Sequence, residues 1–230
     1  MKKNELLQLT ETDKEAIILG DSNYINGKGA VLYNREEYKD AMEYYHIAAA
    51  MDNVQAISNL GYCYLYGRDI NQNTSLALAY FKIAALKGSD YAAYKLGNIY
   101  EVDDWNIKDP EKAVYYYRMA LSYILGEDNE TDAILEHDEL QRNPSLCLAV
   151  GRALTPNGIM GTDLRRSYQF LLHAKRGYEI ALENGDEFYQ DSLAEVEQLL
   201  ELKCFDEIRD EYDKIFNYVY YGVGDVEDDE

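Results

Sequence analysis

Residues 56–88 read AISNLGYCYLYGRDINQNTSLALAYFKIAALKG, and this stretch decides the predicted fold. Small and apolar residues recur in two segments at spacings of three and four, which places them on one face of each of two helices. The first segment ends at Gly67, a residue type that accepts the left-handed conformation after a helix. The second begins after Asn73, an N-cap residue type, and ends at Gly88. The stretch therefore predicts two short helices joined by a polar loop.

The pattern of this stretch recurs along the chain at a spacing of 36 residues. The second helix of each copy is marked by three columns: Ala41, Ala77 and Ala113; Tyr44, Tyr80 and Tyr116; and Ala48, Ala84 and Ala120. A fourth copy follows 54 residues later, at Ser167. The first helix is marked by Leu60-Gly61, Leu96-Gly97 and Val150-Gly151, with Leu19-Gly20 as the expected counterpart in the first copy. Because small residues let two helices approach closely, these columns predict packed helix pairs.

These columns resemble the Sel1-like repeat, a relative of the tetratricopeptide repeat, which has Leu-Gly and Tyr in its first helix and Ala, an aromatic residue and Ala-Ala in its second. The resemblance implies an all-α fold: an α–α superhelix, or solenoid, of about four helix pairs with a C-terminal capping helix. It also implies a protein-binding scaffold or adaptor. The array is expected over residues 1–185, with units at about 13–52, 54–88, 90–125 and 143–185.

Three further segments do not follow the repeat. Residues 122–142 add 18 residues to the spacing and are predicted to be an insertion on one face of the array. Residues 186–221 carry a long apolar stripe with acidic residues opposite, and we predict that they cap the open end of the array, with an interruption allowed near Cys204. The last residues, 222–230, read GVGDVEDDE and are predicted to form a disordered acidic tail.

The net charge of the chain limits the classes of partner that it can bind. The formal net charge is −21, from 43 acidic and 22 basic residues. Such a field repels nucleic acid and anionic lipid, and it is compatible with a basic protein partner. No apolar run approaches the ~18 residues that suggest a spanning helix, and no apolar segment follows the charged N-terminus as in a signal peptide. We therefore expect a cytoplasmic protein with no nucleic-acid or membrane partner, either a monomer or a weak homo-oligomer.

The sequence offers little for catalysis. The candidate metal ligands and nucleophiles are the histidines His46, His137 and His173 and the cysteines Cys63, Cys147 and Cys204. The histidines lack the spacing of a metal site. The cysteines are too sparse for a disulfide framework or a zinc site, so we expect all three cysteines to be reduced core residues. No phosphate-binding glycine loop or hydrolase motif occurs. We predict a non-catalytic protein without cofactor or metal.

A protein-binding surface is predicted on the first helices of the repeats, which line the concave groove of paired-helix arrays. The residues expected to face this groove are Gln55, Ser58, Tyr62, Tyr91, Tyr94, Asn98 and Arg152. Tyrosine supplies contact area at low entropic cost, so Tyr62, Tyr91 and Tyr94 are expected to form an aromatic patch that recognises a peptide or domain. The alternative interpretation is that these tyrosines cover the seams between helices.

Two other functions remain open at the level of sequence. One is a self-associating structural protein, in which the stripe of the cap is incompletely buried. The other is a small-ligand-binding or enzymatic protein that uses carboxylates of the insertion and the cap, which requires an acidic pocket whose groups have shifted pKa values.

Overall fold

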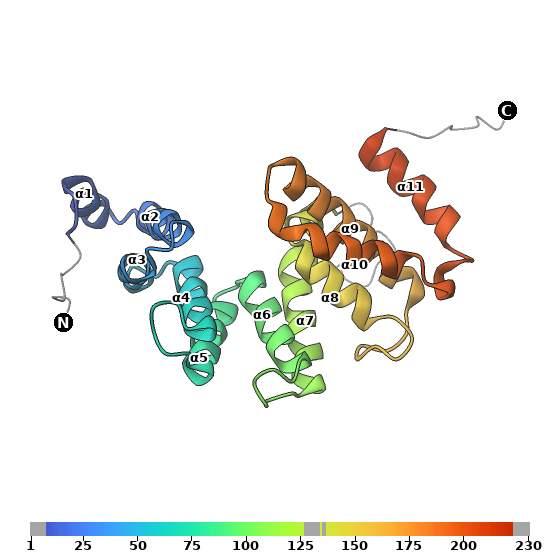
Figure 1. Cartoon of the computed structure of the whole chain (residues 1–230), viewed down its shortest axis with the longest axis horizontal. Coiled ribbons are helices and arrows are strands. Elements are labelled where there is room, and N and C mark those ends of the chain that lie inside the picture. Colours follow the sequence, from blue (N-terminus) through green and yellow to red (C-terminus); the bar gives the residue numbers. More distant parts are fainter. Residues whose placement is uncertain (1–7, 127–133, 135–136, 223–230) are drawn as a thin grey trace. The chain divides into compact units, whose positions relative to one another are not determined.

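All regular secondary structure in the described residues is helical, which confirms the all-α prediction. The computed structural model describes residues 8–126, 134 and 137–222 (Figure 1). Residues 127–133 and 135–136 of the predicted insertion and 223–230 of the predicted disordered tail lie outside this range. The chain divides into two compact units, Met1–Asp109 and Pro110–Glu230. The boundary falls in the loop of the predicted third repeat, whose two helices therefore belong to different units.

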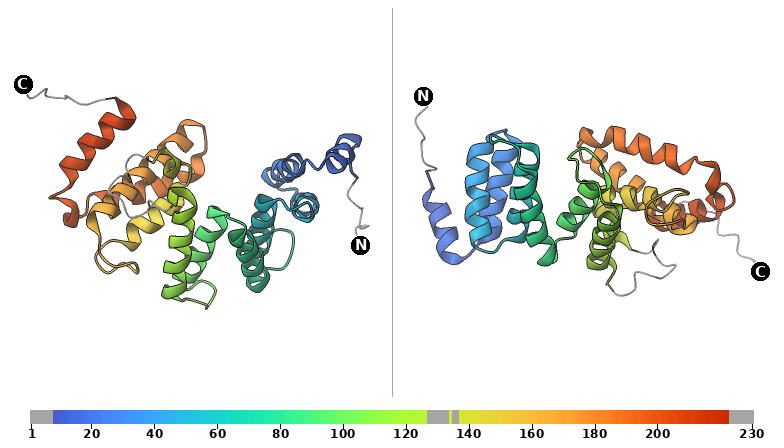
Figure 2. Two further views of the ribbon diagram at one scale, coloured as in Figure 1. Left: turned by 180° about the vertical axis from the view of Figure 1, so that it is seen from behind. Right: turned by 90° about the horizontal axis from the view of Figure 1, so that it is seen from below.

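The first unit is built from helix pairs. Its helices are α1 (Glu11–Leu19), α2 (Ser22–Asn34), α3 (Tyr38–Ala50), α4 (Val54–Tyr66), α5 (Thr74–Leu86) and α6 (Asp90–Glu101). The pairs α2–α3 and α4–α5 lie side by side, with α3 packed on α4 and α5 packed on α6 (Figure 2). The predicted caps are present: the side chain of Asn73 accepts the backbone N–H of Leu76 before α5, and Gly67 ends α4 at a φ of 65°.

Each first helix of a pair has the same internal register. A glycine lies eight residues after the N-cap residue in four helices, the pairs being Asp21 and Gly29, Asn53 and Gly61, Ser89 and Gly97, and Asn143 and Gly151. Gly29, Gly61 and Gly151 face the second helix of their pair. A Cβ atom on Gly61 would stand 3.0 Å from the ring of Phe81, and one on Gly29 would stand 2.8 Å from the ring of Tyr45. The absence of a side chain is therefore what permits the close approach.

The expected counterpart in the first copy, Leu19-Gly20, is wrong. Gly20 ends α1 in the left-handed conformation, at a φ of 76°, and a Cβ atom there would meet no neighbouring atom within 4 Å. The first repeat uses Gly29 instead, 12 residues before Ala41, where the other copies have 16. The difference comes from the connection between the two helices, which has three residues, 35–37, in the first repeat and seven, 67–73, in the second.

Helix α1 is attached to the first repeat by a buried ion pair. Asp13 is fully buried, and its carboxylate lies 2.6 Å from Nζ of Lys28 in α2. The hydroxyl of Tyr44 in α3 donates to the same carboxylate at 2.8 Å. Burial alone would raise the pKa of Asp13, but the hydrogen bonds from Lys28, Thr10 and Tyr44 outweigh it and hold the pKa below its usual value. Asp13 thus links three helices through one charged group.

The second unit continues the pairing and then adds the segment that was predicted to cap the array. Its helices are α7 (Pro110–Leu125), the 3₁₀ turn η3 (Asp138–Arg142), α8 (Pro144–Ala153), α9 (Leu164–Glu183), η4 (Glu187–Tyr189), α10 (Gln190–Leu200), η5 (Lys203–Phe205) and α11 (Arg209–Tyr221). Helices α8 and α9 form a pair, and α10 packs on α9. As in the first unit, Gly151 lies against the second helix, since a Cβ there would stand 2.8 Å from Leu171.

The capping segment contains two helices with a turn between them. The turn includes Cys204, the position at which an interruption was expected. It is fastened by Arg209, whose Nη2 donates to the carbonyl oxygen of Leu200 at 3.0 Å. Most side chains of the stripe are buried or of intermediate exposure, whereas those of Ile215 and Val219 in α11 are 43% and 48% exposed. The outer part of α11 therefore leaves apolar side chains in contact with solvent.

Candidate functional site

The first helices of the first unit present one continuous stripe of side chains. Residues at positions 2, 6, 9 and 13 after the N-cap lie on one side of a helix, because steps of four, three and four residues return to the same face. In α4 the stripe is Gln55, Asn59, Tyr62 and Tyr66, and in α6 its first three members are Tyr91, Lys95 and Asn98. These residues are at least partly exposed, in contrast to the buried apolar face of each helix.

Lys95 is the centre of an aromatic cluster on this stripe. Its Nζ lies 5.3 Å from the ring centroids of both Tyr91 and Tyr94, and 5.6 Å from that of Tyr62 on the neighbouring first helix. Burial lowers the pKa of Lys95 from its usual value. Within the part of the chain that the structure describes, the ammonium group forms no ion pair. Its contacts are with the faces of aromatic rings, which attract a cation but do not neutralise it.

A row of tyrosines continues from this cluster to a second cation. The rings of Tyr62 and Tyr66 are 4.5 Å apart, and that of Tyr33 at the end of α2 lies 6.1 Å from Tyr62. Tyr38 packs edge-on against Tyr33 at 5.0 Å. The guanidinium of Arg68 lies 5.3 Å from the ring of Tyr38 and 5.9 Å from that of Tyr33. We call the whole set the tyrosine surface: Tyr33, Tyr38, Tyr62, Tyr66, Arg68, Tyr91, Tyr94 and Lys95.

The other polar members of the stripe hydrogen-bond to each other. The amide of Gln55 donates to Oδ1 of Asn59 at 3.3 Å, and Nδ2 of Asn59 donates to Oδ1 of Asn26 in α2 at 3.1 Å. The second of these bonds joins α4 to α2. Both bonds fix the orientation of the polar side chains next to the tyrosines.

Two of the seven predicted binding residues do not face the surface. Ser58 is fully buried, and its hydroxyl lies 3.3 Å from that of Ser89. Tyr94 is only 6% exposed, and its oxygen accepts a hydrogen bond from Asn98. Both lie five residues after their N-cap, a position that is rotated from the stripe toward the neighbouring helix. The expectation that they point outward was wrong for this reason, although the ring of Tyr94 still contacts Lys95.

The remaining predicted residues fall into two groups. Gln55, Tyr62, Tyr91 and Asn98 lie on the stripe of the first unit, as the helical offset predicted. Arg152 lies on α8 in the second unit, where its Nη1 is 3.3 Å from a carboxylate oxygen of Glu195 in α10. The structure therefore does not group Arg152 with the others.

Sequence reasoning missed the two cations of the tyrosine surface. Lys95 occupies position 6 of the stripe, which counting from the N-cap residue Ser89 would have identified. Arg68 lies directly after the glycine that ends α4, in a loop with no periodicity. No sequence signal places this loop residue beside Tyr33 and Tyr38, because the contact depends on how the two helix pairs stack.

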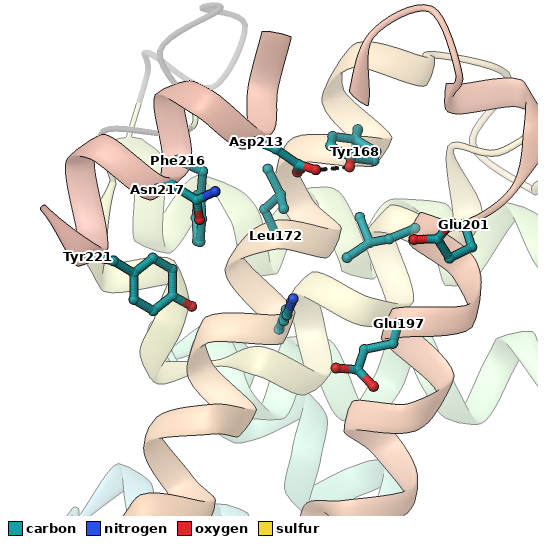
Figure 3. Close-up of a pocket in the computed structure, with 10 residues that line it drawn as sticks. Tyr168, Leu172, Glu197, Glu201, Asp213, Phe216, Asn217 and Tyr221 are labelled. Atoms are coloured by element: carbon teal, nitrogen blue, oxygen red, sulfur yellow. Dashed lines mark hydrogen bonds between the residues drawn. The ribbon is translucent and has the colours of Figure 1, made fainter. Parts of the chain in front are cut away.

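A separate pocket lies in the second unit between α9, α10 and α11 (Figure 3). Its volume is about 260 Å³, and it is lined by Tyr168, Leu172, Lys175, Glu197, Leu200, Glu201, Asp213, Phe216, Asn217 and Tyr221. The hydroxyl of Tyr168 donates to Asp213 at 2.9 Å. The pocket brings carboxylates of the cap together, as the small-ligand alternative requires. Glu197 and Glu201 are exposed, however, whereas catalytic carboxylates depend on a desolvated setting.

None of the described helices is long and apolar enough to cross a bilayer. Across the same residues, no three His, Cys, Asp or Glu side chains gather in a way that could hold a metal ion.

Comparison with known proteins assigns the repeats. The family model described as Sel1 repeat matches residues 16–53, 54–89 and 90–122. Residues 16–122 thus contain three Sel1 repeats, as the columns of Ala, Tyr and Leu-Gly predicted. Proteins with Sel1 repeats generally mediate protein–protein interaction.

Individual proteins also resemble the chain. Chitin synthase regulatory factor 2 of Schizosaccharomyces pombe is 28% identical over 180 residues, which are 77% of this chain and 31% of the yeast protein. The chain therefore spans about a third of the length of this relative. The crystal structure of a Sel1 repeat protein from Oxalobacter formigenes is 25% identical, with a TM-score of 0.42, and covers 51% of this chain and 90% of its own.

Proposed function

We propose that this chain is a non-catalytic adaptor that binds a partner peptide or protein domain on the tyrosine surface of its first unit. The observation that carries the proposal is the convergence of the partly exposed rings of Tyr62 and Tyr91 around Lys95, which also contacts the buried ring of Tyr94. Tyrosine and arginine are enriched among the residues that dominate binding energy at interfaces. A partly exposed row of both is therefore more than the filling of helix seams.

The packing of the row supports a preorganised binding surface. Each tyrosine is held by a ring or cation neighbour, so little side-chain entropy remains to be lost when a partner binds. The hydrogen bonds among Gln55, Asn59 and Asn26 likewise restrict the rotamers of these polar side chains. The yeast relative is named as a regulatory factor, and a protein that regulates by contact needs such a surface.

The proposal is tested by affinity purification from the source organism with the whole chain as bait. The double variant Tyr62→Ala/Tyr91→Ala removes the exposed rings beside Lys95. We expect at least one specific partner to fall about tenfold or more in recovery, since each interface anchor contributes about 2 kcal/mol. The matched control is Tyr115→Ala/Tyr123→Ala on α7, where the rings are 58% and 41% exposed.

Circular dichroism on both variants checks that the helices remain folded. If every partner is recovered equally with the wild-type chain, the tyrosine-surface variant and the α7 control, the tyrosine surface is not the binding site. A loss of recovery with the α7 control alone would place the binding site in the second unit.

A second candidate function is self-association through α11. Ile215, Tyr218 and Val219 are 43%, 58% and 48% exposed on this helix, and an exposed apolar row is a contact site when a second copy can cover it. Light scattering coupled to size exclusion measures the mass directly. A dimer that becomes a monomer in Ile215→Glu/Val219→Glu would support this function, and a monomeric wild-type chain at 100 µM, about the upper range for such an assay, would exclude it.

A further inference from the structure

Lys95 and Arg68 are two cations on the tyrosine surface that have no carboxylate partner. In the described residues neither forms an ion pair, although the chain as a whole has 43 acidic residues against 22 basic ones. The Nε atom of Arg68 is buried without a hydrogen-bond acceptor. A buried donor without an acceptor costs about 1–3 kcal/mol, more for a charged group. In a chain so rich in carboxylates, two unpaired cations on one surface need an explanation.

Aromatic rings connect the two cations. Lys95 contacts Tyr62 at 5.6 Å, Tyr62 lies 6.1 Å from Tyr33, and Arg68 lies 5.9 Å from Tyr33. The separation of the two charges is therefore at most about 18 Å. An extended peptide advances ~3.4 Å per residue, so a segment of about five or six residues can reach both. The tyrosines between them offer apolar contact with polar edges to the intervening side chains.

The charge of the surroundings also favours this part of the molecule for an anion. Residues 1–109 contain 16 acidic and 11 basic residues, whereas residues 110–230 contain 27 and 11. Repulsion of an acidic ligand is thus weakest on the first unit. Within the row, burial raises the pKa of Tyr66; Tyr62, Tyr94 and Asp104 add to the effect, and Arg68 opposes it.

We propose that the partner presents an extended acidic segment to the tyrosine surface, with one carboxylate on Lys95 and a second on Arg68. This inference rests on the proposed function and specifies the chemistry of the partner. It replaces the earlier expectation of a basic partner, which considered the total charge of the chain and not the charge of the surface. A basic segment would place like charges against both cations.

The test is a selection of random 12-residue peptides displayed on phage, with the whole chain as target. Four proteins are compared: the wild-type chain, Lys95→Met, the control Lys82→Met, and Tyr62→Ala/Tyr91→Ala. Lys82 is an exposed lysine on α5, so its substitution changes the net charge equally but on another helix. We expect acidic peptides from the wild-type chain and from Lys82→Met, and loss of the acidic preference in Lys95→Met. Non-specific attraction to so acidic a chain would select basic peptides instead.

The enriched peptide is then measured by fluorescence polarisation. Its dissociation constant should rise about tenfold or more for Lys95→Met, stay within about twofold for Lys82→Met, and recover in Lys95→Arg, which restores the charge. Replacement of Asp and Glu in the peptide by Asn and Gln should weaken binding to the wild-type chain by a similar factor.

Three outcomes overturn the inference: neutral or basic peptides from the wild-type chain, no enriched peptide at all, or equal binding by Lys95→Met and Lys82→Met. Displacement of the peptide by polyuridylate would also overturn it, because the surface would then accept any polyanion. None of these outcomes by itself contradicts the proposed function. If the affinity purification still depends on Tyr62 and Tyr91, the surface binds a partner of different chemistry.

Discussion

At the scale of single residues, the fold depends on where a side chain is absent. Gly29, Gly61 and Gly151 each lie against a large residue of the paired helix, and a Cβ at any of them would stand 3.0 Å or less from it. Glycine weakens a helix by about 1 kcal/mol relative to alanine. The chain accepts this cost at one position per repeat, because the gain is close packing of the pair.

Substitution of two glycines in the same helix tests this interpretation. In Gly29→Ala the new methyl group meets the ring of Tyr45 at 2.8 Å, so we expect a loss of about 1–3 kcal/mol in the free energy of unfolding. In the control Gly27→Ala nothing lies within 4 Å, and alanine should stabilise the helix by about 0.5–1 kcal/mol. Urea denaturation measures both. Equal effects of the two substitutions would show that close approach does not matter at Gly29.

A second residue-scale feature is the buried histidine of α9. His173 is fully buried, its Nε2 lies 2.7 Å from the carbonyl oxygen of Ile134, and its Nδ1 has no hydrogen-bond partner in the described residues. Burial lowers its pKa from 6.5 to about 4. Between these values the unfolded chain binds a proton that the native chain does not bind.

Stability should consequently fall as the pH decreases from 6.5 toward 4. The contribution of His173 is at most about 3.5 kcal/mol, because each unit of pKa difference corresponds to about 1.4 kcal/mol. Urea denaturation at pH 7 and at about pH 5 measures the slope, with His173→Gln as the control, since an amide can still donate to Ile134 but does not titrate. An identical pH slope in the wild-type chain and His173→Gln would remove His173 from this account.

At the scale of elements, attachment of α1 depends on a charged pair where the other repeats have apolar residues. Lys28 stands seven residues after the N-cap of α2, and the same position is Leu60 in α4 and Leu96 in α6. In the second and third repeats that position is buried and apolar. In the first repeat this position is Lys28, which pairs with Asp13. Helix α1 is therefore held by an ion pair, whereas the second and third repeats have leucine at this position.

Removal of one partner should cost more than removal of both. Asp13→Ala leaves Lys28 half-buried without its carboxylate, and we expect a loss of about 3 kcal/mol in the free energy of unfolding. Asp13→Ala/Lys28→Leu restores the residue type of the other repeats and should regain more than half of that loss. Urea denaturation of the two single variants and the double variant gives the coupling directly. A double variant as unstable as the sum of the single ones would exclude the pairing.

At the scale of the whole molecule, the chain forms two compact units, and its acidic residues are distributed unequally between them. The second unit holds 27 of the 43 acidic residues, and the tyrosine surface lies in the first. Each unit contains one fully buried cysteine, Cys63 in α4 and Cys147 in α8, while Cys204 in the cap is partly exposed. Burial raises the pKa of Cys63 to about 11 and also raises that of Cys147. Both groups should therefore be inert in the native chain.

Thiol labelling can thus follow each unit separately. In native buffer at pH 7.5 we expect one fast reaction with a maleimide, at Cys204, and none in Cys204→Ser. In the Cys204→Ser background, the modification of Cys63 and Cys147 at increasing urea concentration reports the opening of the first and second units respectively. Mass spectrometry of the labelled peptides identifies the site. Comparable labelling of all three cysteines without urea would contradict the burial described here.

The sequence by itself determined the helix pairs, their caps and the repeat family. Each of these features depends on residues within one or two turns of a helix, such as Asn73 before α5 and Gly67 after α4, or on a column repeated every 36 residues. It also placed Tyr62 and Tyr91 on an exposed stripe, since that follows from helical periodicity alone.

The tertiary structure decided what periodicity does not contain. It decided three contacts between residues of different helices. These are the approach of Gly29 to Tyr45, the ion pair of Asp13 with Lys28, and the contact of Lys95 with Tyr62. The outward or inward direction of Ser58 and Tyr94 likewise depended on the neighbouring helix. A repeat pattern records the residues that pack within one repeat. The tyrosine surface is set by how successive repeats of the first unit stack, and this stacking is a property of the folded chain.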